Sequence, residues 1–287
     1  KTRLDKMEII ERPQAIPEIK LDFSLTDPPP NKTIISVKNL NFSYGSKTIF
    51  AGASFIVPNG TKTVLLGENG TGKTTLLRLI NNNSSPKIKL VPKARIGYFC
   101  QGFENLDYNR TVLDNVMEDS VQSETVVRTI LARLLISGED VFKKVGLLSG
   151  GERIKVAFAK LFGSNANVLL LDEPTNYLDL KSSQVLENVL AEYPGTVLFV
   201  SHDQAFVQAV ADRLLIIEDH GIREFAGTLQ DFQLSREKTP AIVEKKMEQM
   251  AIQMRITEII TKITQCDGDQ EALEAEYQRL LGQLKER

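Results

Sequence analysis

Two short segments of the chain are almost wholly apolar, residues 168–171 and 197–200, and a helical stretch separates them. Strands that are apolar on both faces belong to a buried parallel sheet with helices on each side. Further β-rich segments, with turn residues between them, precede this pair at residues 34–40, 50–57, 63–66, 88–91 and 95–99. The pattern therefore predicts an α/β domain.

Helical spacing of apolar positions marks two stretches between these strands, residues 73–80 and about 111–162. In the longer stretch the apolar face includes Val126, Ile130, Leu131 and Leu134. We expect helices there, packed against the sheet.

The two ends of the chain differ from this domain. Residues 1–32 combine a short helical pattern with a proline-rich connector, which we interpret as the end of a linker helix; a frayed terminal helix is the alternative. Apolar positions in residues 237–287 recur in steps of three and four and break once, which predicts an antiparallel helical hairpin. Its mixed charges favour a solvated coiled coil over an RNA-binding arm. The predicted α/β domain then covers residues 33–236, and the chain starts without a methionine, as a fragment of a longer protein would.

Composition narrows the class of protein. The net charge of −2 gives no general attraction to nucleic acid or acidic lipid. Two cysteines provide no disulfide framework, so a reducing, cytoplasmic location is expected. No apolar run approaches the roughly 18 residues of a membrane span.

A phosphate-binding loop follows the strand at 63–66. It fits the pattern G-x-x-x-x-G-K-[ST], in which glycines let the backbone wrap phosphates and the helix N-terminus supplies free N–H groups. Lys73 would reach the β and γ oxygens, and the Thr74 hydroxyl would ligate Mg²⁺. The predicted nucleotide-binding residues are Gly67, Glu68, Asn69, Gly70, Thr71, Gly72, Lys73, Thr74 and Thr75.

Carboxylates and a histidine end the two apolar strands. Asp172 is placed to help hold the metal, and Glu173 to orient or deprotonate an attacking water. His202, in Ser-His-Asp, is placed to reach a γ-phosphate. A hydrolase triad is excluded, because adjacent side chains on a strand diverge.

A second phosphate-binding element precedes the strand at 168–171. Ser149 and Glu152 form an S-x-x-E capping box at the start of a helix, and a well-capped helix is the simplest interpretation. Gly150 and Gly151, however, are poor helix formers that expose bare N–H groups at a positive helix end, which suits an anion.

In this order the elements resemble the nucleotide-binding domain of ATP-binding cassette (ABC) proteins, over about residues 33–232. The resemblance implies the P-loop NTPase fold of the ABC type: a parallel core sheet with flanking helices, a small antiparallel β-subdomain and a helical subdomain. It implies ATP and Mg²⁺ as ligands, Tyr44 stacking on adenine, and Gln101 as a sensor of metal and water that acts with Thr74 and Asp172. Residues 148–152 would be the signature motif, Asp179 the D-loop aspartate and His202 the switch histidine.

Among ABC proteins the chain is similar to the soluble ABC-F subfamily, through Glu-Pro-Thr-Asn-Tyr-Leu-Asp at 173–179 and the short stretch from Thr75 to Gln101. That similarity implies a C-terminal half whose partners are the N-terminal cassette of the same protein and the ribosome, at the tRNA exit site, through the linker. Each cassette's signature would act on ATP bound by the other, so this chain alone would be a monomer or a weak head-to-tail homodimer. A translation factor, an antibiotic-resistance protein and, as the alternative class, the ATPase subunit of a membrane transporter remain open.

Overall fold

The computed structural model describes residues 29–30, 32–100, 106–235 and 277 of the chain. Contacts divide the chain into two compact units, residues 1–226 and 227–287, and each is described by itself. The predicted linker helix and nearly all of the predicted hairpin lie outside the described residues, so the domain boundaries stay a prediction. In the second unit, residues 229–235 are helical, and Thr228 and Asp231 cap this segment reciprocally.

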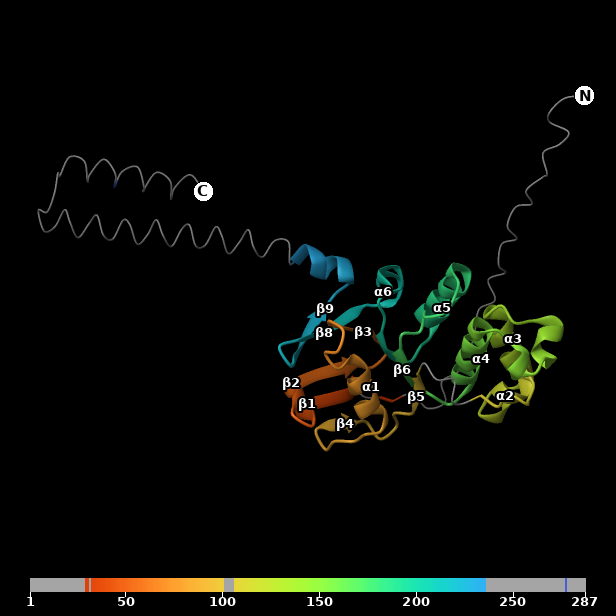
Figure 1. The fold of residues 1–287 in the computed structure, drawn as a ribbon, viewed down its shortest axis with the longest axis horizontal. Helices are drawn as coiled ribbons and strands as arrows, with labels where there is room; N and C mark the ends of the chain where they lie inside the picture. Colours follow the sequence, from red (N-terminus) through yellow and green to blue (C-terminus); the bar gives the residue numbers. More distant parts are fainter. Residues whose placement is uncertain (1–28, 31, 101–105, 236–276, 278–287) are drawn as a thin grey trace, which may run out of the picture. The chain divides into compact units, whose positions relative to one another are not determined.

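A six-stranded core sheet organises the first unit (Figure 1). Its strand order is β5(Ile96–Phe99), β6(Val168–Asp172), β7(Thr196–Val200), β3(Lys62–Leu66), β8(Arg213–Glu218) and β9(Gly221–Ala226). The first five strands are parallel, which confirms the predicted parallel core. β9 is antiparallel and joins β8 through a tight turn at Asp219 and His220, both with positive φ. Every residue of β6 and β7 is buried, as their apolar sequences predicted.

A second, antiparallel sheet has the order β2-β1-β4 and is the predicted β-subdomain. It consists of β1(Thr33–Tyr44), β2(Lys47–Pro58) and the short β4(Ile88–Leu90). β1 is paired with β2 through several register shifts and with β4 in regular register. The β-rich segments at 88–91 and 95–99 therefore form strands of two different sheets.

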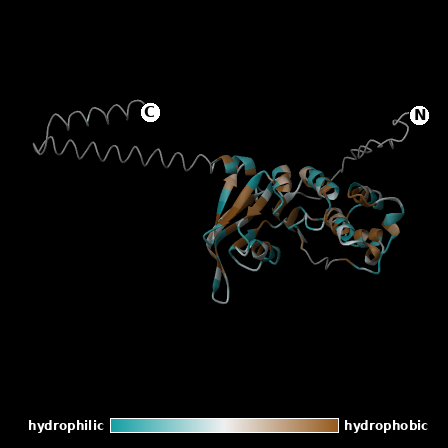
Figure 2. Cartoon of the chain, turned by 45° about the horizontal axis from the view of Figure 1, so that its top comes forward, coloured by the Kyte–Doolittle hydropathy of each residue, from teal (hydrophilic) through white to brown (hydrophobic). Residues whose placement is uncertain are grey.

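Helix α1(Lys73–Asn81) contributes Leu76, Leu77 and Ile80 to the apolar cluster that joins the antiparallel sheet to one face of the core sheet. Among the other helices are α5(Leu180–Glu192) and α6(Gln204–Val210); the ring of Phe206 in α6 packs edge-to-face on Phe199 of β7. Figure 2 shows brown, hydrophobic strands in this core.

The predicted helical stretch 111–162 is broken in the structure. It forms α2(Val112–Glu118), α3(Glu124–Arg133) and α4(Gly150–Gly163), with 3₁₀ turns η2(Gly138–Phe142) and η3(Val145–Leu147) between the last two. On α3 the buried positions are Val127, Ile130 and Leu131, whereas Val126 is only half-buried, so its predicted place on the core face is wrong. Ser123 caps α3 through the Val126 N–H, and the buried residues Val127, Ile130, Leu131 and Leu134 follow the i, i+3, i+4, i+7 spacing of one helix face.

An ion pair links this helical subdomain to a helix of the core sheet. Arg133 at the end of α3 binds both carboxylate oxygens of Glu192 at the end of α5. None of the helices that the structure describes is long and apolar enough to cross a bilayer.

Candidate functional site

The phosphate-binding loop connects β3 to α1, as the motif requires. Gly72 is the residue before α1 and has a φ of 107°, a conformation that only glycine adopts without strain. A Cβ atom at this position would also collide with Ile49 and approach the ring of Phe50 to 3.0 Å. The loop therefore depends on glycine here for two separate reasons, its backbone conformation and its close packing on β2.

Lys73 is buried and its ammonium group points back into the loop. Its Nζ donates to the carbonyl oxygens of Gly67 at 2.8 Å and Glu68 at 3.0 Å. Burial lowers the pKa of Lys73, while the carboxylates of Glu173 and Asp172 oppose that shift. The lysine is thus held where a phosphate in the loop would find a cation.

Thr74 and Asp172 come together from α1 and the end of β6. The Thr74 hydroxyl donates to Asp172 Oδ1 at 3.1 Å. Burial raises the pKa of Asp172, although the Thr74 hydrogen bond and the positive charges of Arg78 and Lys73 oppose the shift. A hydroxyl and a carboxylate are the hard oxygen donors that Mg²⁺ prefers, so this pair fits the predicted metal.

Glu173 and His202 form the next pair along the same edge of the sheet. Their closest side-chain atoms, Glu173 Oε1 and His202 Nε2, are 3.3 Å apart, and the His202 N–H donates to Glu173 Oε2 at 3.2 Å. Glu173 has a φ of 51°, which is uncommon for a residue other than glycine, and its N–H bonds the Val200 carbonyl of β7. Its side chain is 14% exposed. The residue lies in a strained turn at the strand end, and such strained backbone conformations cluster at functional sites.

These residues line one cleft of about 380 Å³. Tyr44, at the end of β1, lies at this cleft with its side chain 55% exposed and its ring edge-on to Phe42. Of the predicted site, Tyr44, Asn69, Gly70, Gly72, Lys73, Thr74, Thr75, Asp172, Glu173 and His202 line the cleft. Lys47, Ile49 and Val200 also line it and were not predicted. Lys47 follows the Gly45-Ser46 turn after Tyr44, and this turn in the sequence could have indicated that Lys47 returns to the cleft beside Tyr44.

The signature residues lie at the start of α4 and are not among the residues that line the cleft. The predicted capping box is present: the Glu152 N–H donates to Ser149 Oγ at 3.3 Å, and the Ser149 N–H donates to Glu152 Oε2 at 2.8 Å. Hydrogen bonds from the hydroxyl and the N–H of Ser149 lower the pKa of Glu152. Ser149 and Gly150 are exposed, and they do not line their own chain's nucleotide cleft.

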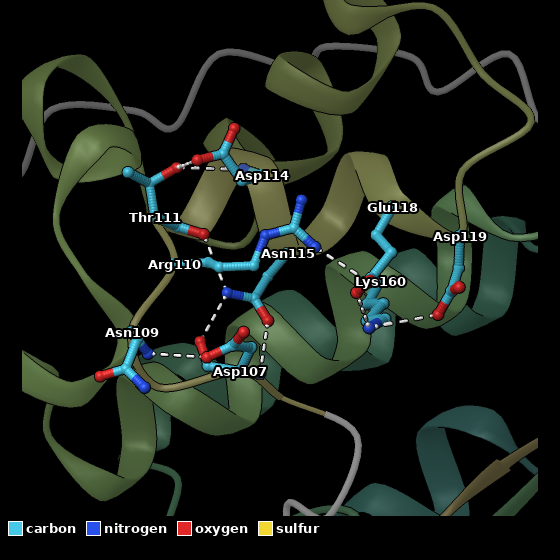
Figure 3. Close-up of polar contacts among 9 residues, drawn as sticks. All are labelled: Asp107, Asn109, Arg110, Thr111, Asp114, Asn115, Glu118, Asp119 and Lys160. Carbon is cyan, nitrogen blue, oxygen red and sulfur yellow. Dashed lines mark hydrogen bonds and ion pairs between the residues drawn. The ribbon is translucent and has the colours of Figure 1, made fainter.

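A polar network fixes the segment that leads to α2 (Figure 3). The fully buried Asn115 side chain bonds both the N–H and the carbonyl of Asp107, and Thr111 caps α2 through the Asp114 N–H. From this segment, the Tyr108 carbonyl accepts from the Gly146 N–H at 2.9 Å, just before the signature.

Arg153 of α4 closes the connection to the signature. Its guanidinium lies 4.9 Å from the centroid of the Tyr108 ring, and it donates to the Val145 and Gly146 carbonyls. The signature helix is therefore anchored to residues 107–111.

Asp179 precedes α5 and accepts from the Ser182 N–H at 2.7 Å, which makes it a helix cap. Two residues before Asp179, the Tyr177 carbonyl lies 3.0 Å from where a Cβ on Gly151 would be. The D-loop and the signature of one chain are thus in contact. Gln101 lies outside the described residues.

Comparisons with known proteins agree with this geometry. The family model described as ABC transporter matches residues 50–176. The ABC transporter F family member 5 of Arabidopsis thaliana is 34% identical over 87% of this chain and 36% of its own length. The erythromycin resistance ATP-binding protein MsrA of Staphylococcus epidermidis is 36% identical over 74% of this chain and 43% of its length. The energy-dependent translational throttle protein EttA of Escherichia coli K12 is 34% identical over 72% and 39%.

Among solved structures, the dimeric post-hydrolysis state of the ATP-binding cassette MJ0796 superposes with a TM-score of 0.56 at 23% identity, covering 67% of this chain and 98% of that one, which shows a shared fold. The fold, the phosphate loop and the strand-end carboxylates define an ABC ATPase domain. Within that class the chain belongs to the ABC-F family, which confirms the resemblance predicted from the sequence. It spans about two fifths of the length of the curated relatives that it matches.

Proposed function

We propose that this chain is the ATP-binding and ATP-hydrolysing cassette of a ribosome-associated ABC-F protein. The observation that carries the proposal is the cleft, in which Lys73, Thr74, Asp172, Glu173 and His202 converge from three strand ends. The translation-related and resistance-related names of EttA and MsrA support the cellular setting. A subunit of a membrane transporter is not favoured by these relatives.

In the proposed reaction each residue has one task. Tyr44 stacks on the adenine, and the loop N–H groups and Lys73 hold the β- and γ-phosphates. Thr74 and Asp172, with Gln101 as the third predicted ligand, would hold Mg²⁺, which would supply positive charge to neutralise the phosphates. Glu173 accepts a proton from the attacking water, and His202 contacts the γ-phosphate.

The exposed signature residues support a second role, in which they act on ATP bound by another cassette. Ser149, Gly150 and Gly151 would bind the γ-phosphate of ATP held by the N-terminal cassette, and that cassette's signature would complete the cleft described above. ATP would then stabilise the closed pair that fits the ribosome at the tRNA exit site, and hydrolysis would release it. Regulation of translation and drug resistance are two uses of this same cycle.

The test separates binding from turnover. Wild-type chain should bind ATP, and Lys73→Ala should abolish that binding in a fluorescent-nucleotide titration. Glu173→Gln should bind ATP normally and lose hydrolysis. In the full-length protein, Glu173→Gln should also retain ribosomes in the presence of ATP during co-sedimentation.

Two results would contradict the proposal. One is equal ATP affinity in the wild type and Lys73→Ala. The other is a rapid ATPase activity per chain that does not change as the isolated chain is diluted, because a site completed by a second cassette must weaken on dilution.

A further inference from the structure

The whole-chain charge of −2 conceals an uneven distribution. From Lys32 to Arg95 the sequence contains ten lysine and arginine residues and one acidic residue, Glu68. Lys62 and Lys73 are buried, but most of the other basic side chains in this segment are exposed. Protein surfaces usually intersperse both signs of charge, so this segment departs from the ordinary pattern.

Three of these lysines gather on the outer face of the antiparallel sheet. Val37 and Ile88 are buried partners, so their neighbours in β1 and β4 point to the opposite face. On that face Ser36 is opposite Lys89, and the Lys38 N–H donates to the Lys87 carbonyl at 3.0 Å, which continues the same register. We call Lys38, Lys87 and Lys89 the lysine face; all three are exposed.

The lysine face is electrostatically unfavourable within the chain itself. Like charges on neighbouring strands repel each other, and Lys38 is directly opposite Lys87. None of the three ammonium groups forms an ion pair with a carboxylate in the part of the chain that the structure describes. A solvated surface would tolerate these charges, but it would not require the near absence of acidic residues across 64 positions.

We propose that the lysine face docks on the phosphate backbone of double-helical RNA. Its polar neighbours on β1 and β2 are Ser36, Ser54 and Asn39, whose hydroxyl and amide groups suit phosphate and 2′-hydroxyl oxygens. The nearby Glu224 carboxylate is bonded to the Ile56 N–H at 2.8 Å. Apart from Ile56, the described neighbours of the lysine face lack the apolar anchors that insertion into a bilayer uses. These neighbours also include no aromatic ring on which an unpaired base would stack, so backbone contact is favoured over base recognition.

The inference rests on the proposed function only for the source of the RNA, which would be ribosomal. None of the three lysines lines the nucleotide cleft, so RNA docking and ATP binding are separable in the same variants.

The test compares two triple variants with the same change in charge. The first triple variant removes the lysine face by the changes Lys38→Glu, Lys87→Glu and Lys89→Glu. The control triple variant changes three exposed lysines elsewhere, two between η2 and η3 and one in α5: Lys143→Glu, Lys144→Glu and Lys181→Glu. Affinity for a labelled RNA hairpin is measured over a range of salt concentrations. The conservative variant Lys38→Arg, Lys87→Arg, Lys89→Arg keeps the charge.

Loss of three phosphate contacts should reduce the magnitude of the slope of log K against log salt concentration by about two to three. It should also weaken RNA binding on the order of 100-fold at about 0.1 M salt. The control triple and the arginine triple should bind RNA nearly as well as the wild type, and all variants should bind ATP alike. Equal effects of the two glutamate triples would overturn the inference. So would tighter binding of polyglutamate, phosphatidylserine vesicles or a DNA duplex than of RNA. Loss of ATP binding in the wild type would count against the proposed function alone.

Discussion

Alanine in place of Gly72 tests the phosphate loop most directly, because two separate penalties meet at this residue. Its φ of 107° lies in the left-handed region, where an L-residue is less stable by about 1–2 kcal/mol. The new Cβ would collide with Ile49 Cγ2 and lie 3.0 Å from Phe50 Cζ, and such overpacking typically costs about 1–3 kcal/mol. We expect the free energy of unfolding to fall by roughly 2–5 kcal/mol.

Two other glycines separate these penalties. Gly70 has a φ of 80°, and no atom lies within 4 Å of the position that a Cβ would take there. Gly70→Ala should therefore cost only the backbone penalty, about 1 kcal/mol after the gain from a less flexible unfolded chain. Gly150 has neither feature, and Gly150→Ala in the first turn of α4 should change stability little or raise it. Urea unfolding monitored by circular dichroism measures all three variants. If Gly72→Ala is no less stable than Gly70→Ala, the packing of the loop on β2 is not as described.

Three further predictions concern the cleft, the signature helix and the pairing of α3 with α5. Tyr44→Ala should weaken ATP binding by about 5- to 160-fold, because stacking on a base is worth about 1–3 kcal/mol, whereas Tyr44→Phe should keep the wild-type affinity; equal affinities of Tyr44→Ala and the wild type would remove Tyr44 from the base site. The pKa of Glu152 is lowered in the fold, so its contribution to stability is present above the unfolded pKa and is lost as pH falls through the folded pKa. Ser149→Ala should bring the Glu152 pKa back toward its ordinary value in an NMR titration, and an unchanged pKa would contradict the capping box as its cause. A double-mutant cycle on Arg133→Ala and Glu192→Ala should give a coupling of about 0.5–1 kcal/mol, whereas strict additivity would show that this ion pair does not join α3 to α5.

Much of the cleft was predictable because parallel strands place their carboxyl ends on one edge. Once residues 63–66, 168–171 and 197–200 were predicted as strands of one sheet, Lys73, Glu173 and His202 had to meet near that edge. Motif spacing then assigned a role to each residue. Local sequence rules were sufficient here because the site is built from short connections after strands.

The helical subdomain was less predictable, because its breaks depend on tertiary contacts. Helical periodicity continues through 111–162, yet the chain turns where Gly146 bonds Tyr108 and where Ser149 caps a new helix. Val127 precedes Ile130 by three residues and Leu131 by four, so helical spacing itself places Val127 rather than Val126 on the core face. The net charge of the chain is likewise uninformative about local clustering, because strand register makes three lysines neighbours in space.

The contact between Gly151 and Tyr177 joins the two halves of the proposed cycle. Tyr177 belongs to the connection that begins at Glu173, so the signature of this chain packs against the same loop that leaves its own cleft. Any ligand that draws Ser149 and Gly150 toward a second cassette must therefore act on the backbone that follows Glu173. The Glu173 N–H is bonded to the Val200 carbonyl and its carboxylate to the backbone N–H of His202, so a displacement of this backbone would reach both strand ends of the cleft. On the proposed function, we therefore expect a cassette that binds its partner's ATP through α4 to adjust the geometry of its own hydrolytic carboxylate, so that the two nucleotide sites would be interdependent without direct contact between them.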